Sequence, residues 1–191
     1  MTLVSQSMTL EDYLRYDDGT DTRYALENGQ LVIMPPESDR NQRIASFLFA
    51  CFLQQGIPLA RLRIGLEIVV AGRRATTRFP DIAILSEELE AVLAGARRAT
   101  VMLDMPPPSL VVEIVSPGSE NRDRDYRYKR SEYAARGITE YWIVDPVEDK
   151  VTILSLLEGL YEEQVFEGDR PLASTVSPDL TLTATEIWAI G

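Results

Sequence analysis

The 191-residue sequence contains no histidine and only one cysteine, Cys51. The absence of histidine excludes the serine and cysteine triads that use an imidazole base, and most zinc sites. A single cysteine excludes a disulfide within the chain, and the apolar run FLFACFL around Cys51 is typical of a small buried core residue. Any metal ion must therefore be held by oxygen ligands, which favours Mg²⁺ or Mn²⁺.

The sequence also lacks a long apolar run and a basic excess. No segment approaches the roughly 18 apolar residues of a membrane span, and the N-terminal MTLVSQSMTLEDYL has neither the basic nor the apolar region of a signal peptide. We therefore expect a cytoplasmic protein. The 19 basic and 30 acidic residues give a net charge of −11, which argues against a nonspecific nucleic-acid coat protein. A nuclease with a local basic groove remains compatible with this charge.

The pattern of apolar residues predicts a single α/β domain over residues 1–191, with a core at about 39–145. A length of 191 residues suits one hydrophobic core. The order helix, three strands, helix, strand in the core predicts a mixed sheet with a helix on each face. The expected elements are a helix at 9–16, a hairpin at 23–34, a helix at 39–55, strands at 62–70 and 79–85, a short helix from Ser86, a strand at 110–115, a helix at 121–136, a strand at 141–144, a second hairpin after Pro146 and a closing helix in ATEIWAI.

Glu113 is the most unusual residue of the chain, because it interrupts the apolar run LVVEIV. Carboxylates are almost never fully buried unless they are paired or bind a metal. Glu113 could pair with an arginine at the sheet end, or it could be a metal ligand. Two further residues favour the second interpretation. Asp81 begins the preceding predicted strand, so the two carboxylates would converge on one cation if their strands are neighbours.

Lys129 lies on the predicted helix that follows the Glu113 strand. Its spacing from Asp125 places the two on one helix face, where they could form an ordinary surface ion pair. Alternatively, Lys129 could lean over the metal site and polarise the attacking water or offset charge on a phosphate. Arginines surround this lysine and interleave with tyrosines, as in helices that contact phosphates and bases. The nucleic-acid-binding candidates are Arg78, Arg122, Arg124, Arg127 and Arg130, with Arg73 and Arg74 as an extension.

The stretch EIVSPGSENRDRDYRYKRSEYAARGITEYWIVDP, taken with the upstream proline–aspartate pair, resembles the Uma family of restriction-endonuclease-like proteins. This family is part of the PD-(D/E)XK nuclease superfamily, and the resemblance extends from TLEDYL to the last hairpin. It implies a restriction-endonuclease-like αβββαβ core with added hairpins at both ends. It also implies a Mg²⁺- or Mn²⁺-dependent endonuclease that hydrolyses phosphodiester bonds, with DNA as the expected substrate and a homodimer as the expected assembly.

The resemblance assigns roles to individual residues. Asp81 and Glu113 match the two metal-binding acids, and the backbone carbonyl of Ile114 would be a further metal ligand. The superfamily lysine normally lies two residues after the glutamate, where this chain has Val115. The Uma family is thought to take its lysine from the following helix, and Lys129 matches it. Asp81, Glu113 and Lys129 are therefore the predicted catalytic residues.

This chain departs from the family pattern at other positions as well. Relatives carry a glutamate in the first hairpin, where this chain has Ala25 and Gln30, and many have a histidine in place of Asn41. These departures leave a second interpretation open, in which the scaffold is a catalytically silent DNA-binding or protein-interaction domain. A third is a structural homodimer that associates through its hairpins.

Overall fold

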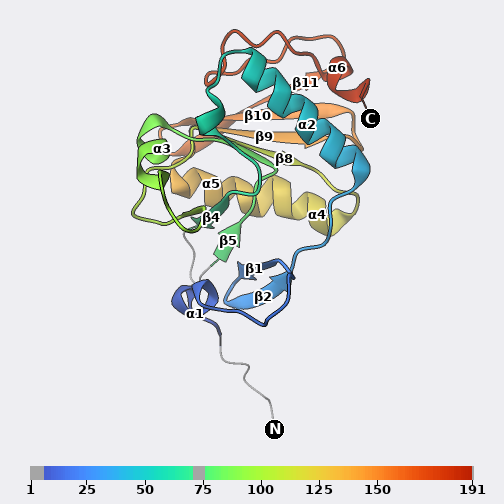
Figure 1. Ribbon diagram of the computed structural model, residues 1–191. Coiled ribbons are helices and arrows are strands. Elements are labelled where there is room, and N and C mark those ends of the chain that lie inside the picture. The colour runs from blue at the N-terminus through green and yellow to red at the C-terminus, as the bar shows by residue number, and fades with distance from the viewer. Residues whose placement is uncertain (1–6, 71–75, 191) are drawn as a thin grey trace.

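The computed structural model describes residues 7–70 and 76–190, and its centre is a six-stranded sheet (Figure 1). The strands lie in the order β11-β10-β9-β8-β6-β3, with bounds Leu160–Glu167, Lys150–Leu157, Glu140–Asp145, Leu110–Ile114, Ile82–Ile84 and Leu62–Arg63. β8 and β9 run parallel, and the other neighbouring pairs run antiparallel. The predicted α/β fold with a mixed sheet is confirmed.

Helices cover both faces of this sheet (Figure 1). α2 (Asp39–Gln54) lies over one face beside α6 (Ala184–Trp188), and Ile44, Leu48 and Phe52 of α2 are fully buried there. These residues recur at steps of three and four, as one face of a helix requires. The segment formed by α4 (Ser119–Asp123), η2 (Arg124–Lys129) and α5 (Arg130–Arg136) covers the opposite face, where Tyr133 is buried. Each fully buried large side chain contributes roughly 1.5–3 kcal/mol to folding.

A smaller unit precedes and flanks the main sheet. α1 (Leu10–Leu14) begins at the N-cap Thr9, and β1 (Tyr24–Glu27) pairs with β2 (Gln30–Ile33). The predicted hairpin turn is confirmed, since Asn28 and Gly29 have φ angles of 50° and 79°, as a type I′ turn requires. A three-stranded sheet of β5 (Thr76–Arg78), β4 (Glu67–Val70) and β7 (Thr100–Val101) lies next to this hairpin. A hydrogen bond of 2.9 Å from the Leu26 amide to Thr77 Oγ1 joins β1 to β5.

The prediction of one continuous strand at 62–70 is wrong, because the extended backbone is interrupted at Gly65. Gly65 has a φ of 70°, and the strands on its two sides, β3 and β4, belong to different sheets. The strand predicted at 79–85 shortens to β6, while β5 immediately before it pairs with β4. The predicted basic turn with Arg73 and Arg74 lies outside the described residues. The short helix predicted from Ser86 is α3 (Glu87–Leu93), with Ser86 as its N-cap.

The helix predicted at 121–136 is present but is not regular. It begins at Ser119, and its middle turn, η2, is a π-helix. Such wide turns are rare and occur often at functional sites. The second predicted hairpin is confirmed as β10 and β11, with φ angles of 50° and 84° at Glu158 and Gly159. No helix within the described ranges is long and apolar enough to cross a membrane.

Candidate active site

Asp81 and Glu113 are neighbours because of the register between β6 and β8. These strands are antiparallel, with Ile82 opposite Val112, so Asp81 and Glu113 occupy the next position beyond the end of the ladder. Side chains at opposed positions project from the same face of a sheet, with Cβ atoms about 5 Å apart. The predicted convergence of the two carboxylates therefore follows from strand pairing.

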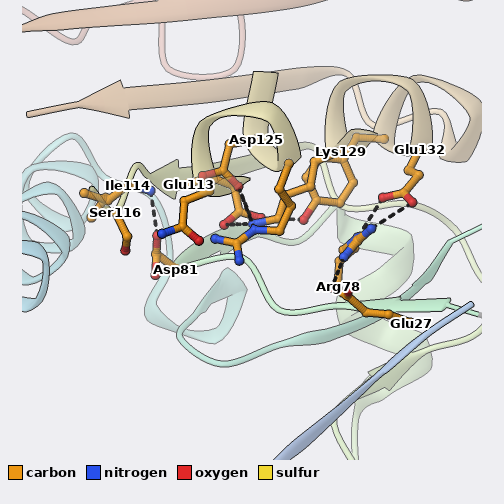
Figure 2. A network of polar contacts seen from close by, with 12 residues as sticks. Glu27, Arg78, Asp81, Glu113, Ile114, Ser116, Asp125, Lys129 and Glu132 are labelled. Atoms are coloured by element: carbon orange, nitrogen blue, oxygen red, sulfur yellow. Dashed lines mark hydrogen bonds and ion pairs between the residues drawn. The ribbon is translucent and has the colours of Figure 1, made fainter. Parts of the chain in front are cut away.

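The backbone of Ile114 completes this edge of the site. Its amide donates a hydrogen bond of 2.6 Å to Asp81 Oδ2, which fixes the carboxylate (Figure 2). Its carbonyl accepts a hydrogen bond of 3.3 Å from the Asn41 side-chain amide, which also donates to Ser116 Oγ at 3.3 Å. Asn41 is buried on the first turn of α2. The position at which the resemblance led us to expect a histidine therefore lies beside the Ile114 carbonyl.

Lys129 reaches the same site from the π-helical turn. Its Nζ lies 2.7 Å from Glu113 Oε2 and 2.8 Å from Asp125 Oδ1, and all three side chains are buried. The hydroxyl of Tyr133 donates to the other oxygen of Glu113 at 2.7 Å. The surface ion pair considered from the sequence is thus a buried triad of two carboxylates and one ammonium (Figure 2). The wide turn is anchored to the sheet because Tyr141 Oη donates to the Asp125 carbonyl at 3.0 Å.

Burial and proximity perturb the acid–base properties of the site. Burial, together with the neighbouring Glu113 carboxylate, raises the pKa of Asp81 to about 8. Burial also raises the pKa of Glu113, and the Lys129 ammonium opposes this effect. Burial alone would lower the pKa of Lys129, but Glu113 and Asp125 outweigh it and the pKa is raised. Lys129 is therefore a charged hydrogen-bond donor and not a general base near neutral pH.

A cavity of about 170 Å³ opens at these residues. One side holds the acids and Lys129, and the other is formed by β2 and the proline pair after it. Val32 and Ile33 are 40% and 63% exposed and present an apolar wall to the cavity. Ala25, where the resemblance led us to expect a glutamate, also lines the cavity.

The five arginines predicted to bind nucleic acid are all engaged with carboxylates. Arg78 is 7% exposed and contacts both Glu27 and Glu132, as Figure 2 shows. The others are also paired, as follows: Arg122 with Glu148, Arg124 with Asp125, Arg127 with Asp123 and Arg130 with Glu163. A phosphate would compete with these carboxylates, although Arg127 and Arg122 keep 70% and 47% of their side chains exposed. Their role in nucleic-acid binding stays a prediction.

Sequence reasoning did not assign a site role to Asp125, Tyr133 or Asn41. The spacing of Asp125 and Tyr133 from Lys129 put them on one helix face, but a helical wheel cannot show that this face points at Glu113. Asn41 lies in the first turn of α2, and the only signal that pointed to it was the histidine that the resemblance led us to expect there. Only the packing of α2 against the end of β8 brings it to the site.

The mixed sheet, the helices on its two faces and the acids at the end of β8 are those of the restriction-endonuclease-like class of folds. The chain belongs to the Uma2 family, described as "Putative restriction endonuclease", whose family model matches residues 10–185. A crystal structure described as "a putative nuclease belonging to DUF820", from Anabaena variabilis ATCC 29413, is similar over 95% of this chain and 98% of that one. The sequence identity is 16% and the TM-score is 0.72. No curated protein matches the chain.

Proposed function

We propose that this protein is a metal-dependent endonuclease that hydrolyses phosphodiester bonds in DNA. The observation that carries this proposal is the convergence of Asp81, Glu113 and Lys129 in one cavity, from a strand start, a strand and a helix. The nuclease-like family agrees with it. A buried ion pair contributes little net stability. Stability of the fold therefore does not explain why two acids and a buried lysine converge at a cavity.

The residues fit a small divalent cation of the Mg²⁺ or Mn²⁺ type. Asp81 and Glu113 offer carboxylate oxygens, and the Ile114 carbonyl offers a third oxygen beside them. The described residues contain no group of three or more histidine, cysteine, aspartate or glutamate side chains placed to hold a metal. The candidate site therefore offers two carboxylates and a backbone carbonyl rather than three side chains. A site with two carboxylates and one carbonyl suits Mg²⁺, which keeps several waters. When bound, such a cation supplies Lewis-acid stabilisation of phosphate charge.

The other residues orient the reacting groups. The Ile114 amide fixes Asp81, and Tyr133 fixes Glu113, so neither carboxylate can rotate freely. The charged Lys129 ammonium would donate hydrogen bonds to the attacking water or to a phosphate oxygen on which negative charge develops. Asp125 holds this ammonium in place from the preceding turn.

Plasmid nicking with Mg²⁺ or Mn²⁺ tests the proposal. We expect wild-type protein to nick supercoiled DNA, and Asp81→Ala, Glu113→Ala and Lys129→Ala to lose activity. Arg43→Ala, on the exposed side of α2, is a matched control that should keep it. Equal activity in all variants would refute the assignment.

The alternative is a catalytically silent DNA-binding or protein-interaction domain on the same scaffold, which the net charge of −11, Val115 and Ala25 motivate. Calorimetry with Mn²⁺ separates the two, because the nuclease requires a site that Asp81→Ala abolishes. No binding at millimolar metal would favour the silent domain.

The homodimer also stays a prediction. Leu157 and Leu160 at the end of the C-terminal hairpin are 55% and 75% exposed, and sedimentation velocity would decide whether they lie in an interface.

A further inference from the structure

A second cavity, of about 310 Å³, lies next to the catalytic one. Phe79 lines both cavities, and alternate residues of β1 face each of them, with Tyr24 in the second cavity and Ala25 in the first. The second cavity is aromatic, because Tyr13, Tyr16 and Tyr24 join Phe79 in its lining. No residue of the proposed catalytic machinery lines it.

Two arginines give this cavity a positive character. Arg23 has no carboxylate partner among the residues that the structure describes, and its guanidinium lies 5.9 Å from the centre of the Phe79 ring. Arg98 lies 5.1 Å from the centre of the Tyr13 ring, and its side chain is 44% exposed. Arg23 therefore differs from Arg78 and the four arginines near the π-helix, each of which is paired with a carboxylate.

The buried Glu67 at this cavity is structural. Tyr13 Oη donates to its Oε1 at 2.6 Å, and Thr100 Oγ1 donates to its Oε2. Arg98 donates to both oxygens, at 3.1 Å and 2.9 Å. The carboxylate is thus satisfied by donors from α1, β7 and the segment before β7. Glu67 therefore holds the cavity wall together, and its hydrogen bonds are complete without a positively charged ligand.

We propose that this aromatic cavity binds a nucleotide of a single-stranded nucleic acid, next to the phosphate that enters the catalytic cavity. The inference rests on the proposed nuclease function. Aromatic side chains and arginine stack on bases of any sequence, and Tyr16 and Tyr24, whose rings meet edge to face at 5.6 Å, offer such surfaces. Arg23 would contact the neighbouring phosphate. A base within a duplex is stacked on its neighbours and cannot enter such a cavity without flipping out.

The charge around the cavity predicts a weak dependence of binding on salt. Asp18 accepts a hydrogen bond of 2.7 Å from the Tyr24 hydroxyl, so a carboxylate lies near the aromatic cluster. Among the residues that the structure describes in the lining of this cavity, Arg23 and the partly neutralised Arg98 are the cations available to phosphates. Single-strand binding loses affinity with a logarithmic salt slope of about −0.7 for each phosphate contacted. We therefore expect a slope of about −1, as for stacking-dominated binding.

Two measurements test the inference. Fluorescence anisotropy in EDTA compares a labelled single-stranded 12-mer with its duplex, for wild type, Arg23→Gln and Tyr16→Ala. We expect preference for the single strand and a loss of about tenfold in each variant. Arg43→Ala, on the exposed side of α2 and away from this cavity, is a matched control that should bind normally. Thermal melting verifies that Arg23→Gln and Tyr16→Ala remain folded.

The second measurement is the hydrolysis of thymidine 5′-p-nitrophenyl phosphate, a small diester that needs only the catalytic cavity. Arg23→Gln and Tyr16→Ala should hydrolyse it as fast as wild type in Mn²⁺. Unchanged single-strand binding in both variants, or equal losses for single strand and duplex, would overturn the inference. No hydrolysis by wild type would count against the proposed function, whereas the binding measured in EDTA decides the second cavity in either case.

Discussion

Lys129 Nζ lies 2.7 Å from Glu113 Oε2. The helical segment after β8 therefore packs its lysine against a carboxylate of β8 itself. Asp125 holds the same ammonium from one turn earlier, at 2.8 Å. Val115 carries no charge, and among the described residues Lys129 is the cation in direct contact with Glu113. This arrangement makes Asp125 a positioning residue, and its role can be separated from that of Lys129.

Asp125→Asn should reduce kcat by about tenfold or more, since the ammonium keeps Glu113 but loses its second carboxylate. Lys129→Ala should reduce kcat further, by about a hundredfold or more, with KM little changed. Asp125→Glu should recover part of the activity of Asp125→Asn. Single-turnover cleavage under saturating Mg²⁺ measures these effects. A change confined to KM would argue that Asp125 only shapes substrate binding.

The raised pKa of Asp81 makes the metal-free protein less stable at alkaline pH. Burial and Glu113 raise that pKa to about 8, from an ordinary value of 3.8. Between these values the folded protein keeps a proton that the unfolded chain has released, so folding stability falls as pH rises from about 4 to 8. Asp81→Asn removes this dependence, and should be more stable than wild type at pH 8 by on the order of 2 kcal/mol.

Urea unfolding in EDTA at pH 5 and pH 8 measures this difference, which should shrink at pH 5. Mn²⁺ should restore the stability of wild type at pH 8 but leave Asp81→Asn less affected, because a ligand stabilises only the state that binds it. A wild-type stability that is constant from pH 5 to pH 8 would contradict the prediction.

The sequence predicts the fold, which is confirmed, and the three candidate site residues, whose roles stay a prediction, for different physical reasons. The periodicity of α2 and the apolar run of β8 are local signals that tertiary packing only reinforces. Glu113 was found because a carboxylate in such a run must have a partner. The break at Gly65 and the π-turn at η2 were missed, since a lone glycine in an apolar run also fits a bulged strand, and one wide turn hardly changes the apolar pattern of a helix. The partners of Arg78 were missed because they come from β1 and α5.

Arg78 should contribute to stability rather than to phosphate binding. Its guanidinium donates to Glu132 at 2.7 Å and 3.0 Å and also contacts Glu27, and it is almost fully buried. Removing one member of a buried ion pair leaves its partners uncompensated. Arg78→Met should therefore lower the free energy of unfolding by about 3 kcal/mol, measured by urea unfolding. Weaker DNA binding at unchanged stability would support the phosphate-binding role expected from the sequence.

Glu140 tests whether a buried carboxylate in an apolar strand is by itself a sign of catalysis. It lies in EYWIVD much as Glu113 lies in LVVEIV, and it is fully buried. Its partners are neutral donors: the Trp142 indole and Ser174 hydroxyl at 2.6 Å, and the amide and hydroxyl of Thr175 at 2.7 Å. These bonds tie the segment around Ser174 to the sheet, and Glu140 forms no ion pair with a described residue.

Glu140→Gln should therefore destabilise the protein by about 2–3 kcal/mol. The glutamine NH₂ group replaces one carboxylate oxygen and faces the N–H and O–H donors that this oxygen accepted from. The kcat of Glu140→Gln should stay at the wild-type value at temperatures where it is folded. Glu113→Gln should show the reverse, with activity lost and stability changed by less than 1 kcal/mol or so, since Asp125 still neutralises Lys129. Urea unfolding and plasmid nicking on the two variants make the comparison. Equal losses of activity would mean that Glu140 shapes the site through the sheet.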